Sequence, residues 1–172
     1  TKSVTSIAVM QLLEKSKFRL DDPVHWYIPQ FKDIGVYQAG VYPNFLTSKP
    51  ERDMSIKDLL THMSGLTYNF MYKTNVDAAH RSSDLMRSEN LEEFVNTLSK
   101  LPLEFSPGKK WNYSVSTDVL GYLVEQVSGQ SLDEYFKKNI FEPLGMEDTD
   151  FECPDDKLSR LASLYEYNQS GK

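Results

Sequence analysis

The segment from Ser3 to Lys15 carries apolar side chains around most of a helical circumference, and this feature constrains the fold more than any other. The polar residues between them are mostly small, and the apolar ones are Val4, Ile7, Ala8, Val9, Met10, Leu12 and Leu13. A helix that is apolar nearly all round is buried rather than laid on the surface. We therefore predict a helix over 3–15 and expect it to be the most buried helix of the structure.

The second half of the chain contains three further helical patterns. Leucine, phenylalanine and valine recur at helical spacing over 91–101, and a second apolar face covers 119–127 before Gly129. Such spacing predicts one buried face on each helix. Ser131 and Glu134 have the spacing of a capping box, which predicts that a third helix begins there.

Two shorter helices are predicted in the first half of the chain. Asp22 can cap a helix in which Pro23 takes the first position, where the missing N–H costs nothing, and which ends near Pro29. Ser55 can cap another helix, which we expect to end at Gly65 with a left-handed glycine.

The remaining segments give only weak strand signals. Residues 30–53 have no sustained period and indicate loops or short edge strands. Residues 67–88 are polar and irregular, which indicates a long loop, with room for a helical turn, of the kind that often serves as a lid. A strand is expected to begin within 160–167. The sequence thus predicts a mainly α structure, and we expect a single domain over 1–172.

Composition excludes several classes of protein. Hydrophobic residues make up 40% of the chain, which is enough for a packed core. The net charge is −6 and no run of lysine or arginine is present, so we expect no nucleic-acid partner but a small neutral or cationic molecule. No apolar run is long enough to span a membrane. The only cysteine, Cys153, cannot form an internal disulfide.

The sequence does not specify where in the cell the protein is located. No secretory leader pattern lies in the sequence, and any leader would precede Thr1. Cytoplasmic, periplasmic and secreted locations are all compatible with these residues, as is any oligomeric state.

Six short stretches, taken together, resemble one enzyme superfamily: the serine β-lactamases, penicillin-binding proteins and family VIII esterases. In chain order they are Thr1-Lys2, Leu20-Asp21-Asp22-Pro23-Val24, Leu59-Leu60-Thr61-His62-Met63-Ser64-Gly65-Leu66, Phe105-Ser106-Pro107-Gly108, Trp111-Asn112-Tyr113-Ser114-Val115 and Pro143-Leu144-Gly145-Met146. The resemblance implies that the chain is the helical region of an α/β fold, with most of the antiparallel sheet missing.

The resemblance also implies acyl transfer through a covalent serine ester. Lys2 matches the lysine of the family's Ser-x-x-Lys block, which places the serine two positions before Thr1. Burial would lower the pKa of this lysine and make it a base. Tyr113 matches the tyrosine that passes the proton to the leaving group. The third block would lie beyond Lys172, so we expect the chain alone to be inactive.

One departure from the family pattern favours esters as substrates. The β-lactamase and transpeptidase members have an asparagine two positions after the tyrosine, whereas this chain has Val115. Ser114 and Val115 are therefore expected to contact the substrate without an amide that could bind a lactam. We expect an esterase-like hydrolase, with β-lactamase, transesterase or D-alanyl-D-alanine peptidase activity as the alternatives within the family.

Two interpretations from other functional classes remain open. A non-catalytic helical binding module would use none of these side chains chemically. Thr1 could serve as an N-terminal nucleophile, although such enzymes lead from the nucleophile into a strand. His62 invites a triad interpretation, but it stands in the Thr-His-Met-Ser-Gly stretch, and we interpret it as structural. The histidines, His25, His62 and His80, have no metal-ligand spacing with Cys153, so no metal site is expected, and no cofactor is expected either.

Overall fold

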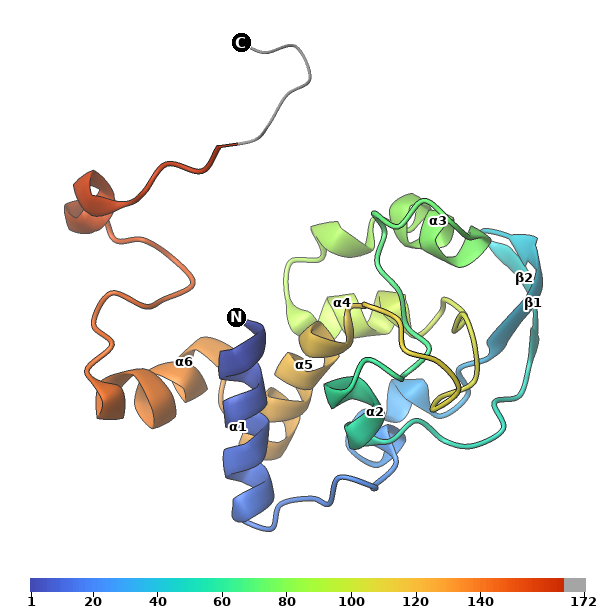
Figure 1. Ribbon diagram of the computed structural model, residues 1–172, viewed down its shortest axis with the longest axis horizontal. Helices are drawn as coiled ribbons and strands as arrows, with labels where there is room; N and C mark the ends of the chain where they lie inside the picture. The colour runs from blue at the N-terminus through green and yellow to red at the C-terminus, as the bar shows by residue number, and fades with distance from the viewer. Residues whose placement is uncertain (166–172) are drawn as a thin grey trace.

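Helix α5 (Ser116–Ser128) is the element to which most others attach in the computed structural model, which describes residues 1–165. Its middle turns are apolar on every side, so helices can pack around it. Four of them do: α1 (Lys2–Glu14), α2 (Ile56–Leu60), α4 (Leu91–Leu98) and α6 (Leu132–Phe136) (Figure 1).

A small antiparallel hairpin lies at the edge of this helical body. Strand β1 (Val36–Val41) pairs with β2 (Asn44–Ser48), and a bulge between Tyr37 and Ala39 interrupts the register. Helix α3 (Asn75–Ser82) packs against β1 (Figure 1). The short edge strands expected within 30–53 are therefore confirmed.

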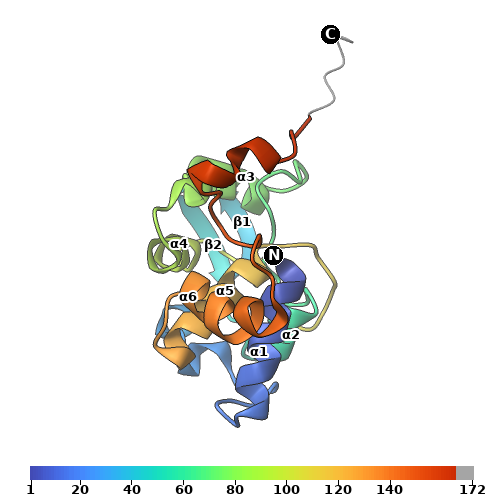
Figure 2. The ribbon, with the colours of Figure 1, turned by 90° about the vertical axis from the view of Figure 1, so that its left-hand side faces the viewer.

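Short helical turns complete the described part of the chain. A π-helical turn continues α6, and the others are of the 3-10 type; their bounds are Val24–Trp26, Pro29–Phe31, Leu85–Arg87, Lys137–Phe141 (π), Glu142–Leu144 and Asp155–Arg160. The segment 155–165 stands apart from the helical body in Figure 1 and passes in front of it in the turned view of Figure 2.

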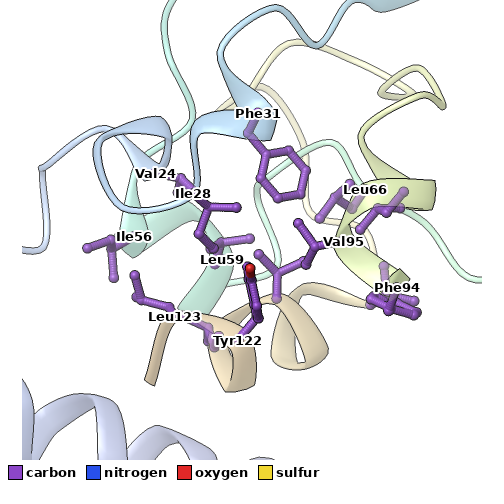
Figure 3. Close-up of a cluster of buried hydrophobic side chains, with 14 of the residues drawn as sticks. Val24, Ile28, Phe31, Ile56, Leu59, Leu66, Phe94, Val95, Tyr122 and Leu123 are labelled. Carbon is purple, nitrogen blue, oxygen red and sulfur yellow. The ribbon is translucent and has the colours of Figure 1, made fainter. Parts of the chain in front are cut away.

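The core forms where α2, α4 and α5 meet the 3-10 turns that follow residue 23. Figure 3 shows apolar side chains from these elements converging, among them Ile28, Leu59, Val95 and Leu123, all of which are essentially inaccessible to solvent. Burying side chains of this size stabilises the fold by about 1.5–3 kcal/mol each relative to exposure. The core thus depends on residues spread over most of the chain.

Helix α1 is placed as predicted, but it is not the most buried helix. Its fully buried positions are Thr5, Ala8, Val9 and Leu12, whereas α5 buries residues over a nearly continuous stretch. Ile7 remains 46% exposed. Helix α1 is apolar around most of its circumference, but neighbours within the described structure cover only one of its sides.

Two helices in the first half of the chain begin or end at other residues than predicted. Asp22 does not cap a helix; its carboxylate accepts hydrogen bonds from the Arg19 N–H and the Tyr27 hydroxyl, and the helical turns start at Val24. Ser55 does cap α2, through a complete capping box with Asp58. That helix ends at Leu60, so Gly65 is not its cap, although Gly65 has the expected positive φ of +87°.

Two other expectations about local structure are wrong. The segment 67–88 holds more than a loop with a helical turn, because it contains the eight-residue helix α3, which begins with a capping box between Thr74 and Asp77. Ser131 stands at the N-terminal cap of α6, but its side chain makes no capping hydrogen bond. The predicted faces of α4 and α5 are confirmed, including the left-handed Gly129 at the end of α5.

Helix predominates over strand in the described chain, as the sequence predicts. The strand expected within 160–167 is absent from the part described, where a 3-10 turn ends at Arg160 and no strand follows up to residue 165; positions 166 and 167 lie outside the described residues. No helix in residues 1–165 combines the length and apolar character needed to cross a bilayer.

Acid should destabilise the protein through His80. This side chain is buried on α3, and burial lowers its pKa to about 4. Unfolded histidine titrates near ~6.5, so the unfolded state binds the extra proton first, and stability falls as the pH drops from about 6.5 towards 4. At ~1.4 kcal/mol per pKa unit, the loss approaches roughly 3 kcal/mol.

Urea unfolding of the protein between pH 7 and pH 4.5 measures this loss. The His80→Leu variant keeps a side chain of similar bulk without the imidazole, so its stability should decline less over the same interval. An equal decline in both proteins would show that His80 is not the group responsible.

Candidate active site

The structure brings Lys2 and Tyr113 together, although they are 111 positions apart in the sequence. The Lys2 Nζ lies 5.0 Å from the centroid of the Tyr113 ring. Lys2 opens α1, Tyr113 lies three positions before α5, and these two helices pack against each other. The packing of the two helices therefore accounts for the meeting of the two side chains.

A second tyrosine, Tyr68, completes the surroundings of the Lys2 ammonium group. Nζ donates a hydrogen bond of 3.2 Å to the Tyr68 Oη and lies 5.6 Å from its ring centroid. Burial raises the pKa of Tyr68, while Lys2 opposes this rise. Tyr68 was not identified from the sequence, because only the tertiary path of its loop places it beside Lys2.

The pKa of Lys2 is shifted in the direction opposite to the one expected. The Tyr113 phenol is the largest cause and raises the pKa of Lys2; burial opposes it, and Tyr68 adds to it. The ammonium form is therefore favoured in this structure. Lys2 is well placed to stabilise negative charge on a neighbouring phenolic oxygen.

Aromatic rings surround Tyr113 on several sides. The Tyr68 ring lies 5.0 Å from it, and Phe70 stacks on Tyr68 at 4.7 Å with an interplanar angle of 21°. The His62 ring lies 5.2 Å from Tyr113, and Trp111 meets His62 edge-on at 6.2 Å. Contacts of this kind fix the plane of a tyrosine ring.

His62 lies beside the site, where the sequence interpretation made it structural. Its Nδ1 is 3.2 Å from the Ser114 Oγ, and its backbone has a positive φ of +56°. Burial, and then the charge of Lys2, lower the pKa of His62. The imidazole is therefore neutral at pH 7.

Ser114 and Val115 do not face the site. Both side chains are 0% exposed, and Val115 is part of the hydrophobic core. The Ser114 hydroxyl is engaged by His62 and by Ser116, whose Oγ lies 2.8 Å away. The contact with substrate that was expected for these two residues has no support in this geometry.

A groove of about 1020 Å³ opens beside Lys2, between α1, α4, α5 and the segment 150–154. Asp118 of α5 lines it together with Thr1 and Thr5, but Tyr113 does not. The two predicted site residues thus touch each other without lining one common groove. Burial raises the pKa of Asp118, and Lys2 opposes this rise.

Metal-binding geometry is not found among residues 1–165. No three side chains of histidine, cysteine, aspartate or glutamate gather there closely enough to hold an ion.

Several known proteins resemble this chain in sequence and in fold. A family model for β-lactamases matches residues 1–172. Protein Rv1367c of Mycobacterium tuberculosis is 31% identical over 172 residues, which are 100% of this chain and 42% of that protein. Esterase EstB of Burkholderia gladioli is 34% identical over 154 residues, which are 88% of this chain and 36% of that protein.

A solved structure agrees with these relatives. The LovD6 mutant of simvastatin synthase from Aspergillus terreus superimposes with a TM-score of 0.80 at 28% identity, over 99% of this chain and 40% of that one. The chain thus spans about two fifths of the length of these relatives. Because the family model matches it from end to end and the fold agrees, the chain belongs to the β-lactamase family.

Proposed function

We propose that this chain supplies the acid/base pair of a serine hydrolase that forms a covalent acyl-serine intermediate. One observation carries the proposal: the ammonium of Lys2 lies 5.0 Å from the ring of Tyr113. A serine hydroxyl is a weak nucleophile until a neighbouring group removes its proton. Lys2 and Tyr113 can do this together, because the ammonium stabilises the phenolate that accepts the proton.

In the proposed reaction the nucleophile is the serine of the family's Ser-x-x-Lys block, which the resemblance implies one helical turn before Lys2. Its Oγ attacks the ester carbonyl carbon, and its proton passes to the Lys2–Tyr113 pair. The tetrahedral intermediate then collapses, the bond between the carbonyl carbon and the alkoxy oxygen breaks, and the pair gives its proton to that oxygen, so the alcohol leaves and the acyl-serine remains. Water attacks the acyl-serine by the same steps in reverse order, which releases the acid and restores the serine.

Esters are the substrates that the residues favour. The position two residues after the tyrosine holds Val115, which has no hydrogen-bonding group and is buried in the core. An amide that could bind a lactam is therefore missing there. The similarity to Esterase EstB of Burkholderia gladioli supports the same preference. We propose short-chain carboxylic esters as the substrate class.

Side-by-side assays test this preference. The full-length protein carrying this chain is expected to hydrolyse a chromogenic short-chain ester with a higher kcat/KM than a chromogenic cephalosporin. Faster turnover of the cephalosporin would contradict the ester preference while leaving the acyl-serine chemistry intact. Hydrolysis of neither compound would favour the non-catalytic binding module.

A further inference from the structure

His62 contacts four consecutive residues of the segment that carries Tyr113. Its carbonyl oxygen accepts a hydrogen bond of 2.9 Å from the Asn112 N–H, and its Nδ1 lies 3.2 Å from the Ser114 Oγ. Its ring packs against those of Trp111 and Tyr113. The positive φ of His62 costs about 1–3 kcal/mol in a non-glycine residue, so these surroundings hold it in place.

Three buried serine hydroxyls continue from His62 into the interior. The Ser114 Oγ is 2.8 Å from the Ser116 Oγ, which is 2.8 Å from the Ser64 Oγ. At the far end, the Leu66 N–H donates to the Ser64 Oγ at 3.2 Å. All three serine side chains are 0% exposed. This row, the serine relay, therefore exchanges no hydrogen bond with bulk water.

The direction of the serine relay follows from counting its protons. Each hydroxyl has one proton to donate, and the Leu66 N–H can only donate. If Ser64 donates to Ser116, Ser116 to Ser114 and Ser114 to the His62 Nδ1, every hydroxyl proton is used. In the opposite direction the Ser64 proton has no acceptor among the described hydrogen bonds, which costs about 1–3 kcal/mol in a buried site. The first direction is the favoured one.

We propose that His62 is a positioning residue for Tyr113, and that the serine relay holds it as the neutral tautomer with the proton on Nε2. The proposal rests on the function proposed above. Ser114 is then a hydrogen-bond donor within the protein rather than a contact for substrate. The relay fixes the imidazole plane, and the imidazole in turn fixes one face of the Tyr113 ring.

Catalysis depends on this placement because the Tyr113 oxygen must reach the serine, Lys2 and the leaving group. A misplacement of about 1 Å at such a group can cost ~10²-fold in rate. The Tyr68 ring packs on Tyr113 at 5.0 Å, and His62 packs on it at 5.2 Å. Loss of His62 removes one of the rings that pack on Tyr113, and so loosens its placement, without removing any reacting atom.

The tautomer is tested by nitrogen NMR of histidine rings in the full-length protein at neutral pH. His62→Asn assigns the signals of His62, since they vanish in that variant. Wild type should show an unprotonated Nδ1 and a protonated Nε2 in a single fixed form. Ser114→Ala removes the donor to Nδ1 and should shift His62 towards a mixture of tautomers. A wild-type ring protonated on Nδ1, or already mixed, would overturn the relay.

Kinetics test the positioning role. Ser114→Ala and His62→Asn should each lower kcat for the ester by roughly 10- to 100-fold with KM nearly unchanged. Asparagine tolerates a positive φ and offers an acceptor oxygen, but it lacks the ring. Because both changes act through the contact between His62 and Tyr113, the kcat of the double variant should be about as low as that of the more impaired single variant. Wild-type kcat in both single variants would refute the role.

Ser99→Ala is the matched control, because it removes a hydroxyl that donates only to the Asn96 carbonyl at 3.1 Å. Its kcat and the spectrum of His62 should match wild type. A wild type without ester hydrolysis would overturn the proposed function and the positioning role with it, whereas the ring spectrum would still decide the direction of the relay. The two proposals therefore fail by different observations.

Discussion

Lys2→Ala and Tyr113→Phe should each lower kcat/KM for a short-chain ester by about 10²–10⁴-fold in the full-length protein, as loss of a general acid or base does. Each change removes one of the two groups that together take the proton from the serine: the ammonium in Lys2→Ala and the phenol hydroxyl in Tyr113→Phe. Since the Lys2 ammonium lies against the Tyr113 ring, it can stabilise the phenolate, and loss of either group should impair proton transfer. Steady-state hydrolysis of a chromogenic ester, with kcat and KM separated, measures the effect.

Two control variants separate the chemistry from general damage. Lys57→Ala removes an exposed lysine of α2. Tyr27→Phe removes a hydroxyl that donates to Asp22 at 2.8 Å, in a turn outside the site. Both should retain activity within a few-fold of wild type. Full activity in Lys2→Ala and Tyr113→Phe would contradict the proposed mechanism, whatever the controls show.

Gly65→Ala should be the more damaging of two glycine substitutions. Gly65 and Gly129 both have a positive φ, +87° and +71°, so alanine costs about 1–2 kcal/mol at either position. A Cβ on Gly65 would also lie 2.2 Å from the Phe105 carbonyl oxygen, whereas one on Gly129 meets nothing within 4 Å. Overpacking adds about 1–3 kcal/mol, giving roughly 2–5 kcal/mol in total at Gly65.

Gly129→Ala is therefore the control for backbone conformation alone. Denaturant unfolding of the two variants and wild type gives the free energies of unfolding. Gly65→Ala should also weaken ester hydrolysis, because the segment 62–68 carries His62 and Tyr68 to the site. Equal losses of stability in the two variants would show that the approach of Phe105 to Gly65 is not a tight one.

The helical faces of α4 and α5 were predictable because a period of 3.6 residues appears directly in the order of apolar side chains. Helix α3 was missed because its surface is mostly polar, although the Thr74-x-x-Asp77 spacing of its capping box was present in the sequence. The converse error concerned Ser131, where a capping box was predicted and none forms. The helix start at Ser131 was nevertheless predicted correctly, because α6 begins at Leu132 without that capping hydrogen bond.

The degree of burial of α1 was not predictable in the same way. Apolar content shows that a helix prefers to be covered, but only neighbouring elements decide which side is covered. Ile7 is half exposed, whereas Ala8 and Val9 are fully buried. Likewise, the end of α2 at Leu60 is set by the turn that brings His62 to Asn112, and no local signal marks it.

The sequence by itself determined the family, the mainly helical architecture and the candidacy of Lys2 and Tyr113, because motif spacing and apolar periodicity are properties of chain order. The tertiary structure alone decided that these two side chains meet, that Tyr68 and His62 adjoin them, and that Ser114 and Val115 turn inward. The physical reason is that contacts between distant segments depend on how helices pack and loops return, and local sequence does not encode that geometry.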